Sequence, residues 1–153
     1  MCSKITLCLA KTKHKLSKSS ISLLPHQVDA LKWMIKREML TKSNGEVRKG
    51  PYGGILADDM GLGKTLETIG LLLAKGHSKT IIIVPANLIS QWKDEFKKFA
   101  PHIPIVEDVD SNIDGTVLIM SYIKAIRSQY VRDNFWNRII LDEAHYIRNP
   151  KGT

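Results

Sequence analysis

The sequence has little that would place it in a membrane or in an oxidising compartment. Its longest apolar runs, such as TIIIVPANLI, fall well short of the about 20 apolar residues that a membrane-spanning helix needs. Only two cysteines occur, Cys2 and Cys8, and neither has metal-ligand partners at a familiar spacing, so we expect free thiols in a reducing compartment. The N-terminus also lacks the long apolar segment and cleavage site of a signal peptide. We therefore expect no membrane partner and no secretion.

Acidic residues are scarce relative to basic ones. The 153 residues include 15 Asp+Glu and 23 Lys+Arg, which gives a net charge of +8. This excess favours a polyanionic partner, nucleic acid first, although a solubilising surface with a basic tail explains it equally well. Residues 1–20 end in KTKHKLSKSS, which is basic and poorly periodic. We predict a flexible tail there, either a weak nuclear import signal or a solvated arm with no such role.

The rest of the chain alternates between helical and strand patterns. Residues 23–40 predict a helix with Pro25 in its first turn, and Asn-Gly, Gly-Pro and Gly-Gly pairs then predict a loop at 41–54. Apolar runs predict strands at 53–57, 79–85, 103–109, 115–120 and 137–145, and helices are predicted at 64–76, 87–100 and 121–136. This alternation indicates an α/β fold, a parallel sheet with helices on both faces. In the helix at 87–100, Asn87 is a candidate cap and Trp92 lies on the apolar face.

Residues 55–68, ILADDMGLGKTLET, form a candidate phosphate loop between a predicted strand and a predicted helix. Gly61 and Gly63 would bring backbone N–H groups close to an anion. Lys64 would reach the β- and γ-phosphates, and the Thr65 hydroxyl would bind Mg²⁺. The usual G-x-x-x-x-G-K-[ST] pattern is not met, because its first glycine falls on Asp58. This loop instead has an acidic pair followed by two glycines before Lys-Thr, which is the form found in helicase-type motors. The alternative is a chance Gly-Lys-Thr in an ordinary turn.

A second motif, RIILDEAH, places Asp142 and Glu143 at the carboxyl end of an apolar strand. Ligands bind at these strand ends in parallel sheets. Asp142 could hold Mg²⁺ directly or through water, and Glu143 could orient and polarise the attacking water. An acidic cap on a following helix is the alternative, and it becomes less attractive once this motif is paired with the phosphate loop.

These motifs together resemble the Swi/Snf-type ATPases, the double-stranded-DNA-dependent translocases of helicase superfamily two. The resemblance covers residues 21–153 through LLPHQVDALKWM, GGILADDMGLGKTLETI, IIIVPANLISQWKDEFKKF, VLIMSYIKAI and IILDEAHYIRNPKGT. The sequence of these motifs is most similar to the branch that contains helicase-like transcription factor and transcription termination factor two. The viral global transactivators are another candidate branch. The resemblance implies a RecA-like lobe that uses ATP and Mg²⁺ and acts in the nucleus on double-stranded DNA, with nucleosomes or transcription proteins as further partners.

The resemblance also implies roles for individual residues. Gln27 would contact the adenine edge, and His145 would couple the nucleotide state to a second lobe. The nucleotide-binding loop would comprise Asp59, Met60, Gly61, Leu62, Gly63, Lys64 and Thr65, with Lys64, Asp142 and Glu143 as catalytic residues and Thr65 and Asp142 as Mg²⁺ ligands. Contacts to the DNA backbone would come from Asn87, Gln91, Lys93, Ser121 and Tyr122. For Lys93 the alternative is a place on the solvated face of the helix at 87–100, which explains it at least as well.

The resemblance divides the chain into a basic tail at 1–20, an adenine-side helix and loop at 21–50, and a partial ATP-binding lobe at 51–153. It implies a lobe that is incomplete at the C-terminus, because the family continues with another strand and a second RecA-like lobe that carries catalytic arginines. We expect the chain alone to be unstable or inactive, with β-strand 137–145 either pairing directly with 53–57 or leaving an open edge. The alternative function is a non-enzymatic module that binds nucleic acid or a partner; a small P-loop kinase fits poorly.

Overall fold

The computed structural model describes residues 2–17, 21–39, 42–43, 46–47, 53–109 and 115–147. The chain divides into two compact units, the first with residues 1–76 and 97–100 and the second with residues 77–96 and 101–153. The Asn-Gly and Gly-Pro turns predicted at 44–45 and 50–51 lie outside the described residues. Among the helices of the described part, none is long and apolar enough to span a bilayer.

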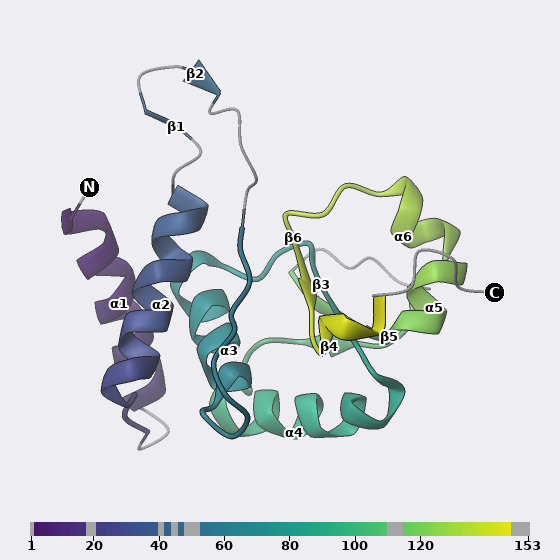
Figure 1. The fold of residues 1–153 in the computed structure, drawn as a ribbon, viewed down its shortest axis with the longest axis horizontal. Coiled ribbons are helices and arrows are strands. Elements are labelled where there is room, and N and C mark those ends of the chain that lie inside the picture. Colours follow the sequence, from purple (N-terminus) through teal and green to yellow (C-terminus); the bar gives the residue numbers. More distant parts are fainter. Residues whose placement is uncertain are drawn as a thin grey trace. The chain divides into compact units, whose positions relative to one another are not determined.

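Three helices make up most of the first unit: α1 (Cys2–Ser17), α2 (Pro25–Met39) and α3 (Lys64–Lys75). Each packs on the other two, and the short antiparallel strands β1 (Lys42–Ser43) and β2 (Glu46–Val47) follow α2 (Figure 1). Leu31 and Ile35 of α2 are fully buried and cluster with Leu71 of α3. The helices predicted at 23–40 and 64–76 are therefore confirmed, and α2 begins at Pro25 as the sequence indicates.

The predicted flexible tail is wrong for residues 2–17, which form α1. Leu16 is fully buried, the Thr12 hydroxyl donates to the carbonyl of Gly70 at 3.2 Å, and the Lys15 amine donates to the carbonyl of Leu73 at 3.2 Å. The apolar face begins at Ile5 and continues through Cys8 and Leu9, before the basic stretch on which the tail was predicted. The prediction for residues 1–20 followed this basic stretch and gave no weight to the helical spacing of the apolar residues before it.

The strand predicted at 53–57 does not form. These residues are described without strand pairing, and the Ile55 side chain is 87% exposed. An apolar run indicates burial, but a strand also needs a hydrogen-bonded neighbour, which composition cannot supply.

The second unit contains a parallel sheet in the order β4-β5-β3-β6. Its strands are β3 (Thr80–Val84), β4 (Ile105–Val106), β5 (Val117–Ser121) and β6 (Arg138–Leu141). Every residue of β3 is buried, so both faces of this central strand are covered, as expected for a parallel α/β sheet. Within the described residues β6 pairs only with β3, so the direct pairing of 137–145 with 53–57 is not found there.

Helical segments connect these strands: η1 (Ala86–Leu88), α4 (Ile89–Phe99), α5 (Tyr122–Arg127), α6 (Gln129–Asp133) and η2 (Ala144–Ile147). Trp92 and Phe96 of α4 are buried as predicted, whereas Asn87 lies inside η1 rather than capping α4. The single helix predicted at 121–136 is wrong, because the helix is interrupted at Ser128. This residue is extended, and its hydroxyl accepts a hydrogen bond from the Val131 N–H at 3.3 Å, which caps a new helix.

Candidate functional site

The predicted phosphate loop leads directly into α3. Gly61 and Gly63 both have left-handed backbones, with φ of 84° and 87°, and Lys64 is the first residue of the helix. A Cβ on Gly61 would meet open space, whereas a Cβ on Gly63 would lie 2.5 Å from Nε2 of Gln27. The sequence therefore places glycine where the turn requires positive φ and, at Gly63, also where a side chain would collide.

Lys64 is held by the loop itself. Its ammonium group donates to the carbonyl oxygens of Asp58 at 2.7 Å and Asp59 at 3.0 Å. The acidic pair thus contacts the lysine through main-chain oxygens, which a motif comparison based on side chains does not reveal. To reach a phosphate, Lys64 has to exchange these two hydrogen bonds for contacts to the anion.

Gln27 braces the same loop from α2. Its Nε2 donates to the carbonyl of Leu62 at 3.0 Å, its Oε1 accepts from the Leu24 N–H at 3.0 Å, and its side chain is buried. The imidazole Nε2 of His26 lies 3.2 Å from the same carbonyl of Leu62. Both ends of the Gln27 carboxamide are therefore engaged by protein groups, and its contact with adenine stays a prediction.

The other loop residues differ in exposure. Met60 is 90% exposed, Asp59 and Leu62 are also exposed, and Thr65 is half-buried in the first turn of α3. Sequence reasoning missed Glu67, one turn beyond Lys64. Its side chain is fully buried, and its carboxylate oxygens have no hydrogen-bond partner among the described residues. Burial and then the charge of Asp58 raise the pKa of Glu67 to about 7, against the lowering effects of His26 and Lys64.

In the second unit, the carboxyl ends of β3, β5 and β6 meet at one edge of the sheet. The register pairs Val84 with Ser121 and Ile83 with Leu141, and the Asp142 N–H continues the ladder by donating to the Ile83 carbonyl at 2.9 Å. The predicted acidic motif and the predicted backbone-contact motif at Ser121 therefore share this edge. Parallel strands explain the juxtaposition, because all their carboxyl ends point the same way.

The acidic turn after β6 is conformationally strained. Glu143 has a φ of 51°, which is uncommon for a residue with a side chain. Its N–H donates to Oδ1 of Asp142 at 3.0 Å, its carbonyl accepts from the Tyr146 N–H at 3.0 Å, and its Oε2 lies 3.2 Å from Nδ1 of His145. The turn thus brings Asp142, Glu143 and His145 together, as such strained turns often do at functional sites.

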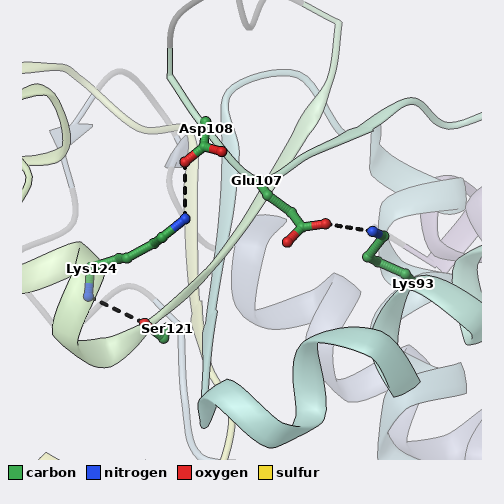
Figure 2. A network of polar contacts seen from close by, with 5 residues as sticks. All are labelled: Lys93, Glu107, Asp108, Ser121 and Lys124. Carbon is green, nitrogen blue, oxygen red and sulfur yellow. Dashed lines mark hydrogen bonds and ion pairs between the residues drawn. The ribbon is translucent and has the colours of Figure 1, made fainter.

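The predicted DNA-contacting residues belong to the same unit, and two of them, Ser121 and Tyr122, are half-buried. Asn87 and Gln91 are exposed, and Figure 2 shows Lys93 paired with Glu107. The same figure shows Lys124 paired with Asp108. Nζ of Lys124 lies 3.0 Å from Oδ1 of Asp108. The Ser121 hydroxyl caps α5 by accepting from the Lys124 N–H at 3.3 Å.

Two aromatic side chains contact Asp142 directly. The Trp92 indole N–H donates to Oδ2 of Asp142 at 2.7 Å, and the Tyr122 hydroxyl donates to the Asp142 carbonyl at 2.7 Å. Burial first, and then the charges of Asp142 and Glu143, raise the pKa of the Tyr122 phenol, which keeps it a donor. Sequence reasoning assigned Trp92 to the core and missed this contact; the available signal was that buried indoles usually find an acceptor.

The residues present fit a nucleotide phosphate and Mg²⁺ in their chemistry. The loop offers open space at Gly61, a lysine and a helix N-terminus, which suit a phosphate. Each Asp142 oxygen accepts one hydrogen bond and keeps lone pairs for a hard cation. In the described part of the chain, no cluster of three or more His, Cys, Asp or Glu residues could hold a metal. Mg²⁺ suits such sparse protein ligation, because it is commonly bound by one or two carboxylates together with substrate phosphates.

Residues 26–153 match the family model of the SNF2-related domain. The chain belongs to the SNF2-related domain family. This SNF2-related domain is 34% identical over 146 residues to a probable global transactivator of Orgyia pseudotsugata multicapsid polyhedrosis virus, which covers 84% of this chain and 28% of the relative. It is 34% identical over 148 residues to SWI/SNF-related matrix-associated actin-dependent regulator of chromatin subfamily A member 1 of Mus musculus, covering 84% of this chain and 13% of the relative.

A solved structure gives the same assignment. The Sulfolobus solfataricus SWI2/SNF2 ATPase core in complex with dsDNA has 29% identity to this SNF2-related domain and a TM-score of 0.71, covering 86% of this chain and 28% of that one. The predicted RecA-like α/β fold and the predicted resemblance to Swi/Snf-type ATPases of helicase superfamily two are confirmed. The SNF2-related domain spans 28% or less of the two curated relatives described.

Proposed function

We propose that the chain is the ATP-binding lobe of a double-stranded-DNA-dependent ATPase and translocase that remodels protein–DNA complexes in chromatin or transcription. The observation that carries this proposal is the glycine loop at the start of α3, with Lys64 as the first helical residue, in a chain that matches the SNF2-related domain over residues 26–153. The relatives that are chromatin regulators or a viral transactivator support a nuclear site of action.

In the proposed reaction, the phosphate loop binds the nucleotide and the acidic turn acts on its terminal phosphate. Lys64 would leave the carbonyls of Asp58 and Asp59 to neutralise phosphate charge, and the α3 N-terminus would add its partial positive charge. Thr65 and Asp142 would hold Mg²⁺, which when bound neutralises further phosphate charge. Glu143 would orient the attacking water, and its contact with His145 supports a coupling role for that histidine.

Double-stranded DNA is the proposed polymer substrate. The net charge of +8 and the dsDNA complex of the structural neighbour support it. Asn87, Gln91, Lys93, Ser121 and Tyr122 are the proposed contacts to its backbone. Since the relatives are several times longer than this chain, we also propose that rapid hydrolysis needs a second RecA-like lobe whose arginines complete the ATP site, and that nucleosomes or transcription proteins are engaged by the whole protein.

The test compares Lys64→Ala and Glu143→Gln with wild type. Binding of ATP by the chain should weaken at least about tenfold in Lys64→Ala, because each charge-assisted contact contributes about 1.5–3 kcal/mol. In the whole protein, with its second lobe, Glu143→Gln should keep ATP binding and lose phosphate release, measured with duplex DNA present. Lys75→Ala, at the exposed end of the same helix, is the matched control.

Two outcomes contradict the assigned roles. Unchanged ATP affinity in Lys64→Ala would show that the loop does not bind the nucleotide. Normal turnover in Glu143→Gln would show that Glu143 does not orient the attacking water. DNA binding that is indifferent to both ATP and Lys64 would favour a non-enzymatic module that only occupies nucleic acid.

A further inference from the structure

Asp142 is fixed from two sides by residues of two different segments. The Trp92 indole of α4 donates to its carboxylate at 2.7 Å, and the Tyr122 hydroxyl at the start of α5 donates to its main-chain oxygen at 2.7 Å. One bond sets the orientation of the side chain and the other sets the position of the backbone. The carboxylate bond is charge-assisted, which makes it stronger than a neutral hydrogen bond of the same length.

The two aromatic residues are themselves held in place. Trp92 is 3% exposed and contacts Phe96, with ring centroids 6.3 Å apart. Tyr122 stacks on Tyr146 of η2, with ring centroids 6.0 Å apart and 14° between the ring planes. Since the Tyr146 N–H also donates to the Glu143 carbonyl, the contact from Tyr122 reaches the acidic turn by two routes.

Trp92 lies beside proposed DNA contacts, and Tyr122 is itself one of them. Trp92 stands between Gln91 and Lys93, whose side chains are exposed while the indole is buried. Tyr122 directly follows Ser121 at the end of β5. A displacement of either segment on binding a DNA backbone would therefore move a hydrogen-bond donor of Asp142.

We infer that Trp92 and Tyr122 are positioning residues that couple the two proposed DNA-contacting segments to the proposed Mg²⁺ ligand Asp142. This inference rests on the proposed function and deepens it, because it names a route within one unit by which duplex DNA changes the nucleotide site. Outer-shell donors of this kind tune a ligand's orientation and its affinity for metal.

The test measures binding rather than turnover, on the full chain. The probe is Mn²⁺ with a non-hydrolysable ATP analogue, and its affinity is determined with and without duplex DNA by electron paramagnetic resonance. In wild type, DNA should tighten Mn²⁺–nucleotide binding. Trp92→Phe and Tyr122→Phe each remove one hydrogen-bond donor and keep an aromatic ring, so each should lower Mn²⁺ affinity by about tenfold or more. Each should also reduce the DNA effect, the ratio of Mn²⁺ affinity with DNA to that without DNA, to a value close to one.

Matched controls remove the same groups elsewhere. Trp136→Phe removes an indole N–H that donates to the Val131 carbonyl at 2.9 Å, and Tyr130→Phe removes the hydroxyl from a ring that packs on Trp136. Neither should change the DNA effect. In an Asp142→Asn background, Trp92→Phe should add little further loss, because the two changes act through one contact.

A second measurement uses only the wild-type chain, in case a variant fails to fold. In a nitrogen-15 NMR spectrum, the Trp92 indole resonance should shift on addition of Mg²⁺–nucleotide and again on addition of duplex DNA, while the Trp136 resonance stays in place. An unshifted Trp92 resonance, or wild-type coupling retained in both phenylalanine variants, would overturn the inference while ATP and DNA binding still stand. A wild-type chain that binds neither ATP nor DNA would instead overturn the proposed function and this inference with it.

Discussion

Glu67 places a buried acid beside the loop proposed to bind a phosphate, and this arrangement should make stability depend on pH. Its pKa is raised from 4.5 to about 7, first by burial and then by Asp58, while His26 and Lys64 oppose the rise. Between these two values the folded chain retains a proton that the unfolded chain releases, so stability should fall as pH rises through this window. The shift corresponds to at most about 3 kcal/mol.

Glu67→Gln should remove this pH dependence while keeping the side-chain shape. The variant should match wild type near pH 4.5 and exceed its stability above pH 7, measured from urea unfolding at several pH values with a chelator present. Glu95→Gln, a half-buried glutamate on α4, is the control. Parallel pH profiles for wild type and Glu67→Gln would show that Glu67 does not carry the effect.

Among the elements, α1 offers the clearest test of a segment that the sequence pattern misassigned. Leu16 is fully buried on α1, whereas Lys13 of the same helix is exposed. Leu16→Ala should lower the free energy of unfolding by about 2–5 kcal/mol, because it removes buried methyl groups and leaves a cavity. Lys13→Ala should change it by less than about 0.5 kcal/mol, as an exposed substitution does. Equal stability of the two variants in chemical denaturation would restore the flexible-tail prediction.

Elements with a complete pattern of their own were predictable from the sequence. The strand β3 is a β-branched run stopped by Pro85, and α3 runs from the glycine loop to Gly76. Prediction failed where the outcome depends on a competing or distant partner. Ser128 caps a new helix in place of continuing the old one, and residues 53–57 have the composition of a strand without a pairing neighbour.

The candidate site was predictable in residue type but not in its contacts. Lys64 and Asp142 stand out because a phosphate and Mg²⁺ need an ammonium group and a carboxylate. The hydrogen bonds of Lys64 to the carbonyls of Asp58 and Asp59 depend on the backbone conformation of the loop, which the residue types in the motif do not reveal. The contact between Trp92 and Asp142 depends on the parallel pairing of β3 with β6, which brings distant segments to one edge of the sheet.

For the molecule as a whole, charge should govern DNA binding. The net charge of +8 favours a polyanion, yet acidic residues engage the lysines beside the proposed DNA-contacting segments, since Glu107 pairs with Lys93 and Asp108 pairs with Lys124 (Figure 2). Such exposed pairs contribute little to stability, about 0–1 kcal/mol each. Their larger effect should be on DNA, because a phosphate has to compete with the carboxylate for the same ammonium group.

Glu107→Gln should therefore strengthen binding of duplex DNA, by severalfold at low salt and by less at high salt, because exposed charges are screened as ionic strength rises. Glu95→Gln removes the same charge from α4 without touching the pair, so it separates the specific competition from the change in net charge. Fluorescence anisotropy with a labelled duplex at a series of salt concentrations measures both effects. If the two variants bind DNA equally well, net charge alone accounts for the gain and Lys93 is not a contact. If only Glu107→Gln gains affinity, and Lys93→Ala abolishes that gain, Lys93 lies on the DNA-binding face.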